Sequence, residues 1–150
     1  MERLVNKLKE KGLTISSCES LTGGLFASKI VEISGASSVL VGSYVTYMDR
    51  CKETLLDGKE VLESVGAISE QMAILMAKKV KEKLSSNISV SFTGNAGPSA
   101  SEGKEVGLVY TCIFINDDYF VYKDIYKGDR NDIRNQVIND AITRILGKIN

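Results

Sequence analysis

The spacing of apolar and polar residues divides the chain into helical and extended segments. Apolar residues at helical spacing predict helices over residues 2–11, 22–33, 69–84 and 130–148 and shorter helical segments over 49–56 and 59–64. Runs rich in β-branched and aromatic residues predict strands over 13–18, 38–47, 88–92, 106–115 and 118–126. The last two strands form a hairpin across Asn116-Asp117. We therefore predict an α/β fold: a three-layer α/β/α sandwich with a mixed, mostly parallel sheet and one antiparallel hairpin.

Size and charge narrow the classes of function. The 150 residues are expected to form a single domain over residues 1–150, with a hydrophobic core of its own. The formal net charge is zero, so we expect no nucleic-acid partner, and the lysines within residues 78–83 are typical of a solvated helix face. The longest apolar run, Gly107 to Ile115, has the length of a strand, and the first helix lacks a signal-peptide pattern. We therefore expect no membrane partner and a cytoplasmic protein.

The reactive side chains limit the available chemistry. The chain contains no histidine, which excludes Ser-His-Asp and Cys-His catalysis and any histidine-containing metal site. A hydrolase of this composition needs Lys, Asp, Glu, Tyr or an activated water as its base. Cys18, Cys51 and Cys112 are odd in number and form no CxxC pair, so we expect reduced, mostly buried thiols and no metal site.

The segment from Cys18 to Gly24 joins a predicted strand to a predicted helix. Ser20 therefore lies on a strand-to-helix turn, and Thr22 is placed to cap the helix. The free N–H groups and positive dipole end of such a helix suit an anion or a developing oxyanion, which makes Ser20 a candidate nucleophile. The same residues are also compatible with a capped helix after a tight turn, without any chemistry.

Other polar residues follow the remaining predicted strands. Tyr47, Lys52 and Thr93 lie at or just beyond strand ends, and the carboxyl ends of strands in an open α/β sheet converge on one crevice. These side chains can therefore meet Ser20, although each also has a purely structural interpretation. The stretch from Thr93 to Glu105 contains three glycines and the only proline, and is either a ligand-binding loop or a mobile connection.

Six short blocks of the sequence match one family pattern in order and in spacing. They are Cys18-Glu19-Ser20-Leu21-Thr22-Gly23-Gly24, the segment from Tyr47 to Asp57 with Lys52 at its centre, Gly66-Ala67-Ile68-Ser69-Glu70, Thr93-Gly94-Asn95-Ala96-Gly97-Pro98, Glu105-Val106-Gly107 and the segment from Gly128 to Arg134. On these blocks the chain resembles the CinA carboxy-terminal domain family, also known as PncC, the nicotinamide mononucleotide deamidases. The resemblance runs from about residue 3 to about residue 146. It implies the stand-alone form of a domain that follows a molybdopterin-binding-like domain in larger relatives.

The resemblance implies an activity and a set of residues for it. The reaction is hydrolysis of the carboxamide of nicotinamide mononucleotide to nicotinic acid mononucleotide and ammonia, a step of pyridine nucleotide salvage that needs no metal or organic cofactor. Ser20 is implied as the nucleophile and Lys52 as the base, which acts directly or through Tyr47 in a Ser-Lys arrangement. The implied partners are a small-molecule nucleotide and further copies of the chain, in a dimer or higher homo-oligomer. The implied substrate-binding residues are Glu19, Thr22, Gly23, Gly24, Thr93, Gly94, Asn95, Gly97, Arg130 and Arg134.

Within this set, the backbone N–H groups from Thr22 to Gly24 are expected to hold the oxyanion. Thr93, Gly94 and one of the two arginines, Arg130 or Arg134, are expected to take the phosphate and ribose.

The chain also departs from the family pattern. Leu21 replaces a cysteine, Cys18 an alanine, Asp49 an asparagine and Asn95 an isoleucine, and Ser99-Ala100-Ser101 replaces a glycine-rich tip. The nucleophile, the lysine and the tyrosine are retained, so the departures affect substrate fit more than chemistry. Two alternatives stay open: a related amidase with another substrate, and a non-catalytic nucleotide-binding or protein-interaction module that has kept the fold.

Overall fold

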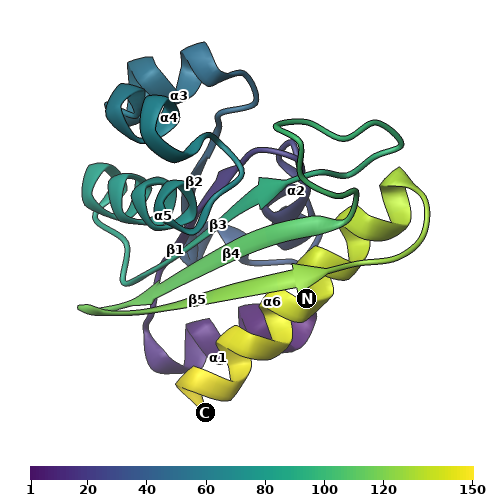
Figure 1. Ribbon diagram of the computed structural model, residues 1–150. Coiled ribbons are helices and arrows are strands. Elements are labelled where there is room, and N and C mark those ends of the chain that lie inside the picture. Colours follow the sequence, from purple (N-terminus) through teal and green to yellow (C-terminus); the bar gives the residue numbers. More distant parts are fainter.

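A five-stranded sheet organises the computed structural model, which describes residues 1–150 (Figure 1). Its strands lie in the order β2-β1-β3-β4-β5. β1 is parallel to both of its neighbours, β2 and β3, whereas the β3–β4 and β4–β5 pairs are antiparallel. The strands are β1 (Ile15–Glu19), β2 (Leu40–Val45), β3 (Ile88–Gly94), β4 (Leu108–Ile115) and β5 (Asp118–Ile125).

Helices cover both faces of this sheet. The helices are α1 (Glu2–Lys11), α2 (Leu25–Val31), α3 (Asp49–Leu56), α4 (Lys59–Val65), α5 (Glu70–Leu84) and α6 (Arg130–Ile149), with a short 3₁₀ turn at Ala36–Ser38. α5 packs on β1, β3 and β4, with α3 and α4 beside it, whereas α1, α2 and α6 share a separate hydrophobic core on the other face (Figure 1). None of the six helices combines the length and the apolar content needed to cross a membrane.

The predicted α/β class and the mixed sheet are confirmed, but the sheet is only half parallel. Two of its four strand pairings, β3–β4 and β4–β5, are antiparallel, whereas the two pairings of β1 are parallel. A parallel neighbour needs a crossover of a dozen or more residues, usually a helix. The segment between β3 and β4 contains no helix and returns the chain directly alongside β3.

The two central strands have small polar residues among their buried positions. Ser89 and Ser91 of β3 are fully buried and donate hydrogen bonds to main-chain carbonyl groups of α5, at 2.7 Å to Ala77 O and 2.6 Å to Ala73 O. Small side chains on both elements allow this close approach, and each hydroxyl has the partner that a buried polar group requires. These bonds fix α5 against the sheet and therefore fix the position of the segment that precedes α5.

Several element boundaries differ from the predictions. The helix expected over 22–33 is the shorter α2, which begins after Gly24, and the strand expected over 38–47 is β2, which ends at Val45. The segment expected as a helical turn over 59–64 is the complete helix α4. The shortened elements leave residues 20–24 and 46–48 as connections at the carboxyl ends of β1 and β2, which is where the candidate site lies.

Candidate active site

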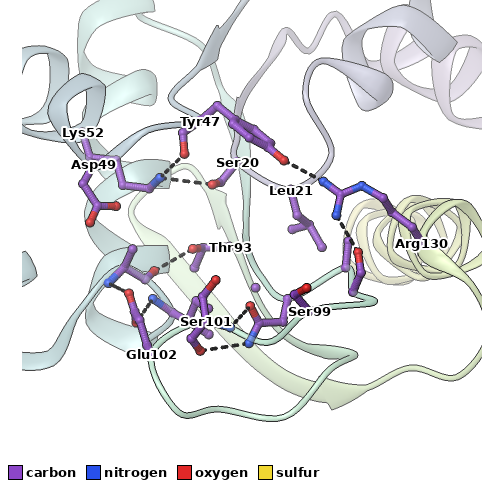
Figure 2. Close-up of a pocket in the computed structure, with 16 residues that line it drawn as sticks. Ser20, Leu21, Tyr47, Asp49, Lys52, Thr93, Ser99, Ser101, Glu102 and Arg130 are labelled. Carbon is purple, nitrogen blue, oxygen red and sulfur yellow. Dashed lines mark hydrogen bonds between the residues drawn. The ribbon is translucent and has the colours of Figure 1, made fainter.

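A pocket of about 320 Å³ opens at the carboxyl ends of β1, β2 and β3 (Figure 2). Its walls come from the turn after β1, the connection between β2 and α3, the segment before α5, the β3–β4 loop and the start of α6. The expected convergence of Ser20, Tyr47, Lys52 and Thr93 is observed, because all four line this one pocket. Gly94, Asn95, Gly97 and Arg130 line it as well, whereas Glu19, Thr22, Gly23, Gly24 and Arg134 do not.

Ser20 and Lys52 form a hydrogen-bonded pair at the base of the pocket. The Nζ atom of Lys52 lies 3.1 Å from the Oγ atom of Ser20. It also donates to the main-chain oxygens of Thr46 at 2.6 Å and Tyr47 at 3.3 Å. These three acceptors match the three donors of an ammonium group. A neutral amine in the same place can keep both carbonyl contacts and direct its lone pair at the Ser20 hydroxyl.

The surroundings of Lys52 favour its neutral form. The residue is only 1% exposed, and burial lowers the pKa of its ammonium group below the usual 10.5. Asp49, one turn earlier on α3, opposes this effect and is the largest influence that raises the pKa. No carboxylate pairs with Lys52, since none of the ion pairs of the protein includes it. A buried, unpaired amine is the type of group that serves as a general base near neutral pH.

Glu19 has a structural position that the sequence did not predict. Its fully buried carboxylate accepts hydrogen bonds from the backbone N–H groups of Gly24 at 2.9 Å, Phe26 at 3.2 Å and Ala27 at 3.0 Å. The last residue of β1 therefore caps α2 in place of Thr22, whose hydroxyl is buried without a hydrogen-bond partner. The N-terminus of α2 is thus occupied by a carboxylate of the protein itself.

This cap changes the expected oxyanion site. The Gly24 N–H group donates to Glu19, and the Gly23 N–H group donates to the carbonyl oxygen of Ser20 at 3.0 Å. By contrast, the N–H groups of Leu21 and Thr22 donate no hydrogen bond within the chain. Of these two residues only Leu21 lines the pocket, so its N–H group is the donor available next to Ser20.

The two candidate arginines have different surroundings. Arg134 donates to the carbonyl oxygens of Leu21 at 3.1 Å and Thr22 at 2.8 Å, which braces the turn that carries Ser20. Arg130 lies at the mouth of the pocket, where it donates to Gly97 O and to the Tyr47 hydroxyl, both at 2.6 Å (Figure 2). Of the pair, only Arg130 is therefore positioned to contact a ligand in the pocket.

The loop between β3 and β4 is held in one conformation by internal hydrogen bonds. The Asn95 side chain donates to the carbonyl oxygens of Ser101 at 3.2 Å and Lys104 at 3.0 Å, and it accepts from the Ser101 N–H group at 3.1 Å. Asn95 was expected to bind substrate, but its amide is committed to the loop. Thr93, only 1% exposed, donates to the carbonyl oxygen of Ala67 at 2.6 Å.

Glu102 is a residue of the site that the sequence did not indicate. Its carboxylate lines the pocket and accepts from the N–H groups of Ala67 and Ile68, both at 2.9 Å. Gly66 permits this contact: its φ is 83°, and a Cβ atom there would lie 2.5 Å from Glu102 Oε1. Residues 66–70 are one of the six blocks that match the family pattern, and the sequence assigned no role to them. Ala67 and Ile68 of this block line the pocket, and the close approach of Glu102 explains why a glycine precedes them.

Apolar side chains from three of these walls also face the pocket. Leu21, Ala67, Ile68 and Ala96 line it alongside the polar groups described above. No group of three or more cysteine or acidic side chains is arranged to hold a metal ion. The site thus combines a serine hydroxyl, a buried amine, apolar side chains and one guanidinium group.

Known proteins resemble this chain along nearly its whole length. The sequence matches the family described as CinA C-terminal domain over residues 1–149. A CinA-like protein of Petrotoga mobilis is 43% identical over 145 residues, which are 95% of this chain and 36% of that protein. A CinA-like protein of Kosmotoga olearia is 44% identical over 143 residues, which are 94% of this chain and 35% of that protein. The chain spans about a third of the length of the curated relatives it matches.

Solved structures of other proteins share the fold of this chain. The competence/damage inducible protein CihA from Agrobacterium tumefaciens is 33% identical, with a TM-score of 0.92 over 97% of this chain and 90% of that one. A CinA superfamily protein from Klebsiella pneumoniae has a TM-score of 0.95 over 99% of this chain and 94% of that one, and its 23% identity shows a shared fold. With the family pattern matched from residue 1 to residue 149, the chain belongs to the CinA C-terminal domain family.

Proposed function

We propose that this domain is an amidohydrolase that converts nicotinamide mononucleotide to nicotinic acid mononucleotide and ammonia. The observation that carries the proposal is the contact of 3.1 Å between Lys52 Nζ and Ser20 Oγ inside a pocket. A serine beside a buried amine without a salt-bridge partner is an arrangement that can replace the histidine of other serine hydrolases. The chain contains no histidine that could take this role.

The first half of the reaction forms an acyl-enzyme. Neutral Lys52 accepts the Ser20 proton while the Ser20 oxygen attacks the carboxamide carbon, which gives a tetrahedral intermediate with a negatively charged oxygen. The N–H group of Leu21, which lines the pocket and has no partner within the chain, is the available donor for that oxygen, and a well-placed donor contributes about 3 kcal/mol. Lys52 then returns the proton to the leaving nitrogen, and ammonia departs as the ester to Ser20 forms.

The second half of the reaction hydrolyses the acyl-enzyme. Lys52, again neutral, takes a proton from a water molecule that attacks the ester carbon, and the Ser20 oxygen recovers a proton as the carboxylic acid leaves. Proton transfer runs directly between Lys52 and Ser20, because the two atoms are in hydrogen-bond contact and the Tyr47 hydroxyl is bonded to Arg130 instead.

The pocket has the features that a pyridine nucleotide requires. The apolar side chains of Leu21, Ile68 and Ala96 suit the faces of the nicotinamide ring, and Arg130 at the mouth suits the phosphate. In the proposed binding mode, the amide lies near Ser20 and the charged end of the nucleotide lies near solvent.

An ammonia-release assay with purified protein and nicotinamide mononucleotide tests the proposal. We expect turnover by the wild type and a loss of at least about a thousandfold in Ser20→Ala, some 4 kcal/mol in the barrier. The matched control is Ser28→Ala, a serine of α2 that does not line the pocket. Full turnover by a folded Ser20→Ala variant would exclude Ser20 as the nucleophile.

One observation favours a second candidate function. The β3–β4 loop departs from the family pattern at Asn95 and at residues 99–101, and this loop forms one wall of the pocket. A domain that binds a nucleotide without hydrolysing it fits such a change. Calorimetric binding of nicotinamide mononucleotide with no release of ammonia supports this second function and contradicts the first.

A further inference from the structure

The phenol of Tyr47 points away from the pair that performs the chemistry. Its hydroxyl oxygen accepts a hydrogen bond of 2.6 Å from Arg130 Nη2, while only its main-chain oxygen contacts Lys52 (Figure 2). The residue is 54% exposed, whereas Lys52 is buried. A side chain in this position is not suited to carry protons between Ser20 and Lys52.

The donors of this Tyr47–Arg130 pair are only partly used. Because the Tyr47 oxygen accepts from Arg130, its own proton is free for an acceptor outside the chain. The guanidinium group has five N–H donors, and its hydrogen bonds within the chain go to two acceptors, Gly97 O and the Tyr47 hydroxyl. Arg130 forms no ion pair, so its positive charge at the pocket mouth is not neutralised by the protein.

We infer that Tyr47 is a specificity residue for a phosphate group, which its hydroxyl binds together with Arg130. Donation from a cation polarises the phenol and strengthens the hydrogen bond that it donates in turn. A phosphate offers several oxygens to a hydroxyl and a guanidinium that already lie side by side. The inference rests on the proposed function, because it names the part of the nucleotide that this end of the pocket recognises.

The arrangement also means that the amide end of the substrate does not contact the Tyr47 hydroxyl when it is bound at Ser20. Ser20 Oγ contacts Lys52 at the base of the pocket, whereas the Tyr47 hydroxyl contacts Arg130 at the mouth. A nucleotide has its carboxamide and its phosphate at opposite ends, with the ribose between them. The two side chains therefore meet different ends of the same ligand.

Kinetics of Tyr47→Phe with two substrates test this role. Nicotinamide mononucleotide carries the phosphate, and nicotinamide riboside lacks it. We expect KM for the mononucleotide to rise about tenfold or more, with kcat within about twofold of the wild type, and the riboside kinetics to change by less than about twofold. Tyr119→Phe is the matched control, because Tyr119 is 51% exposed, lies on β5 and makes no side-chain hydrogen bond. A large fall in kcat for both substrates would assign Tyr47 to proton transfer and overturn the inference.

A binding measurement separates this inference from the proposed function. We expect ribose 5-phosphate to bind the wild type and to bind Tyr47→Phe about tenfold more weakly, while Tyr119→Phe matches the wild type. Such binding supports the phosphate site even if the wild type releases no ammonia, an outcome that would refute only the amidohydrolase. Equal affinity of wild type and Tyr47→Phe for ribose 5-phosphate would refute the phosphate role whether or not the protein hydrolyses the mononucleotide.

Discussion

Lys52 Nζ lies 3.1 Å from Ser20 Oγ, although the two residues are 32 positions apart in the chain. Sheet topology brings them together. β1 and β2 are parallel neighbours, so their carboxyl ends lie at the same edge of the sheet. Ser20 directly follows β1, and α3 begins four residues after β2 ends and carries Lys52. The contact thus depends on the parallel pairing of two short strands, and substitutions that disturb this pairing will separate the pair.

Lys52→Arg is expected to remove the activity almost completely. A guanidinium group does not lose its proton at working pH, so it cannot accept the Ser20 proton. The expected loss in kcat for nicotinamide mononucleotide is about a thousandfold or more, measured by ammonia release. Lys78→Arg on the exposed face of α5 is the control and should retain wild-type turnover. An active Lys52→Arg enzyme would require another base.

Asp49→Asn is expected to move the rising limb of the pH–rate profile to lower pH. Asp49 is the largest influence that raises the pKa of Lys52, so loss of its charge lowers that pKa further. More of the amine is then neutral at a given pH below the limb. The profile of kcat/KM against pH measures the shift at low ionic strength, and the shift should shrink in high salt. A limb that stays in place would mean that the titrating group is not Lys52.

The pH dependence of stability should also report the buried lysine. Its pKa is lower in the folded protein than the usual 10.5, so the unfolded chain binds more protons between those two values. The free energy of unfolding of the wild type therefore rises with pH through that window, by up to about 1.4 kcal/mol for each unit of pKa difference. Lys52→Met lacks this contribution. Urea denaturation at several pH values should show the difference between the two proteins changing across the window, and parallel curves would contradict the burial effect.

The sequence predicted the topology of the site better than the contacts within it. Strand ends were recognisable from β-branched runs, and the rule that parallel strands end at a common crevice placed Ser20, Lys52 and Thr93 together, as observed. The direction of each side chain depends on neighbours that are distant in sequence. No local pattern indicates that Glu19 turns back to cap α2, or that the Tyr47 hydroxyl meets a guanidinium group 83 residues later.

The same limit explains the sheet and the arginines. The antiparallel addition of β4 to β3 could not be distinguished from a parallel order, because periodicity shows that a strand is buried but not which strand it joins. Arg130 and Arg134 are one helical turn apart, so both were candidates for the phosphate. Only the structure shows that Arg134 is used by the carbonyl groups of Leu21 and Thr22.

Alanine substitutions of these two arginines should therefore have different effects. Arg130→Ala is expected to weaken binding of nicotinamide mononucleotide by about 1.5–3 kcal/mol with little change in stability, because a hydrogen bond to a charged ligand is lost. Free nicotinamide, which has no phosphate, should be a poor substrate of the wild type. Arg134→Ala is expected to lower the free energy of unfolding by about 1–3 kcal/mol, since two carbonyl groups lose their donor. Calorimetry and urea denaturation distinguish the two, and identical behaviour of both variants would refute the assignment.

Glu102→Ala is expected to loosen the wall of the pocket opposite Ser20. The Glu102 carboxylate holds the Ala67 and Ile68 N–H groups, and Lys104 on the same loop donates to the Ile68 carbonyl oxygen. The side chain of Glu102 is only 27% exposed, and loss of two charge-assisted hydrogen bonds should lower stability by about 2 kcal/mol or more.

The same substitution should raise KM for nicotinamide mononucleotide more than it lowers kcat, because the Glu102 carboxylate makes no hydrogen bond to Ser20 or Lys52 and raises the pKa of Lys52 less than Asp49 does. Glu102→Gln keeps one acceptor oxygen and should fall between the wild type and the alanine variant in both measurements. Glu105→Ala is the matched control, since Glu105 is exposed and its carboxylate makes no hydrogen bond or ion pair. If Glu102→Ala and Glu105→Ala have the same KM and the same urea midpoint, the carboxylate of Glu102 does not hold this wall.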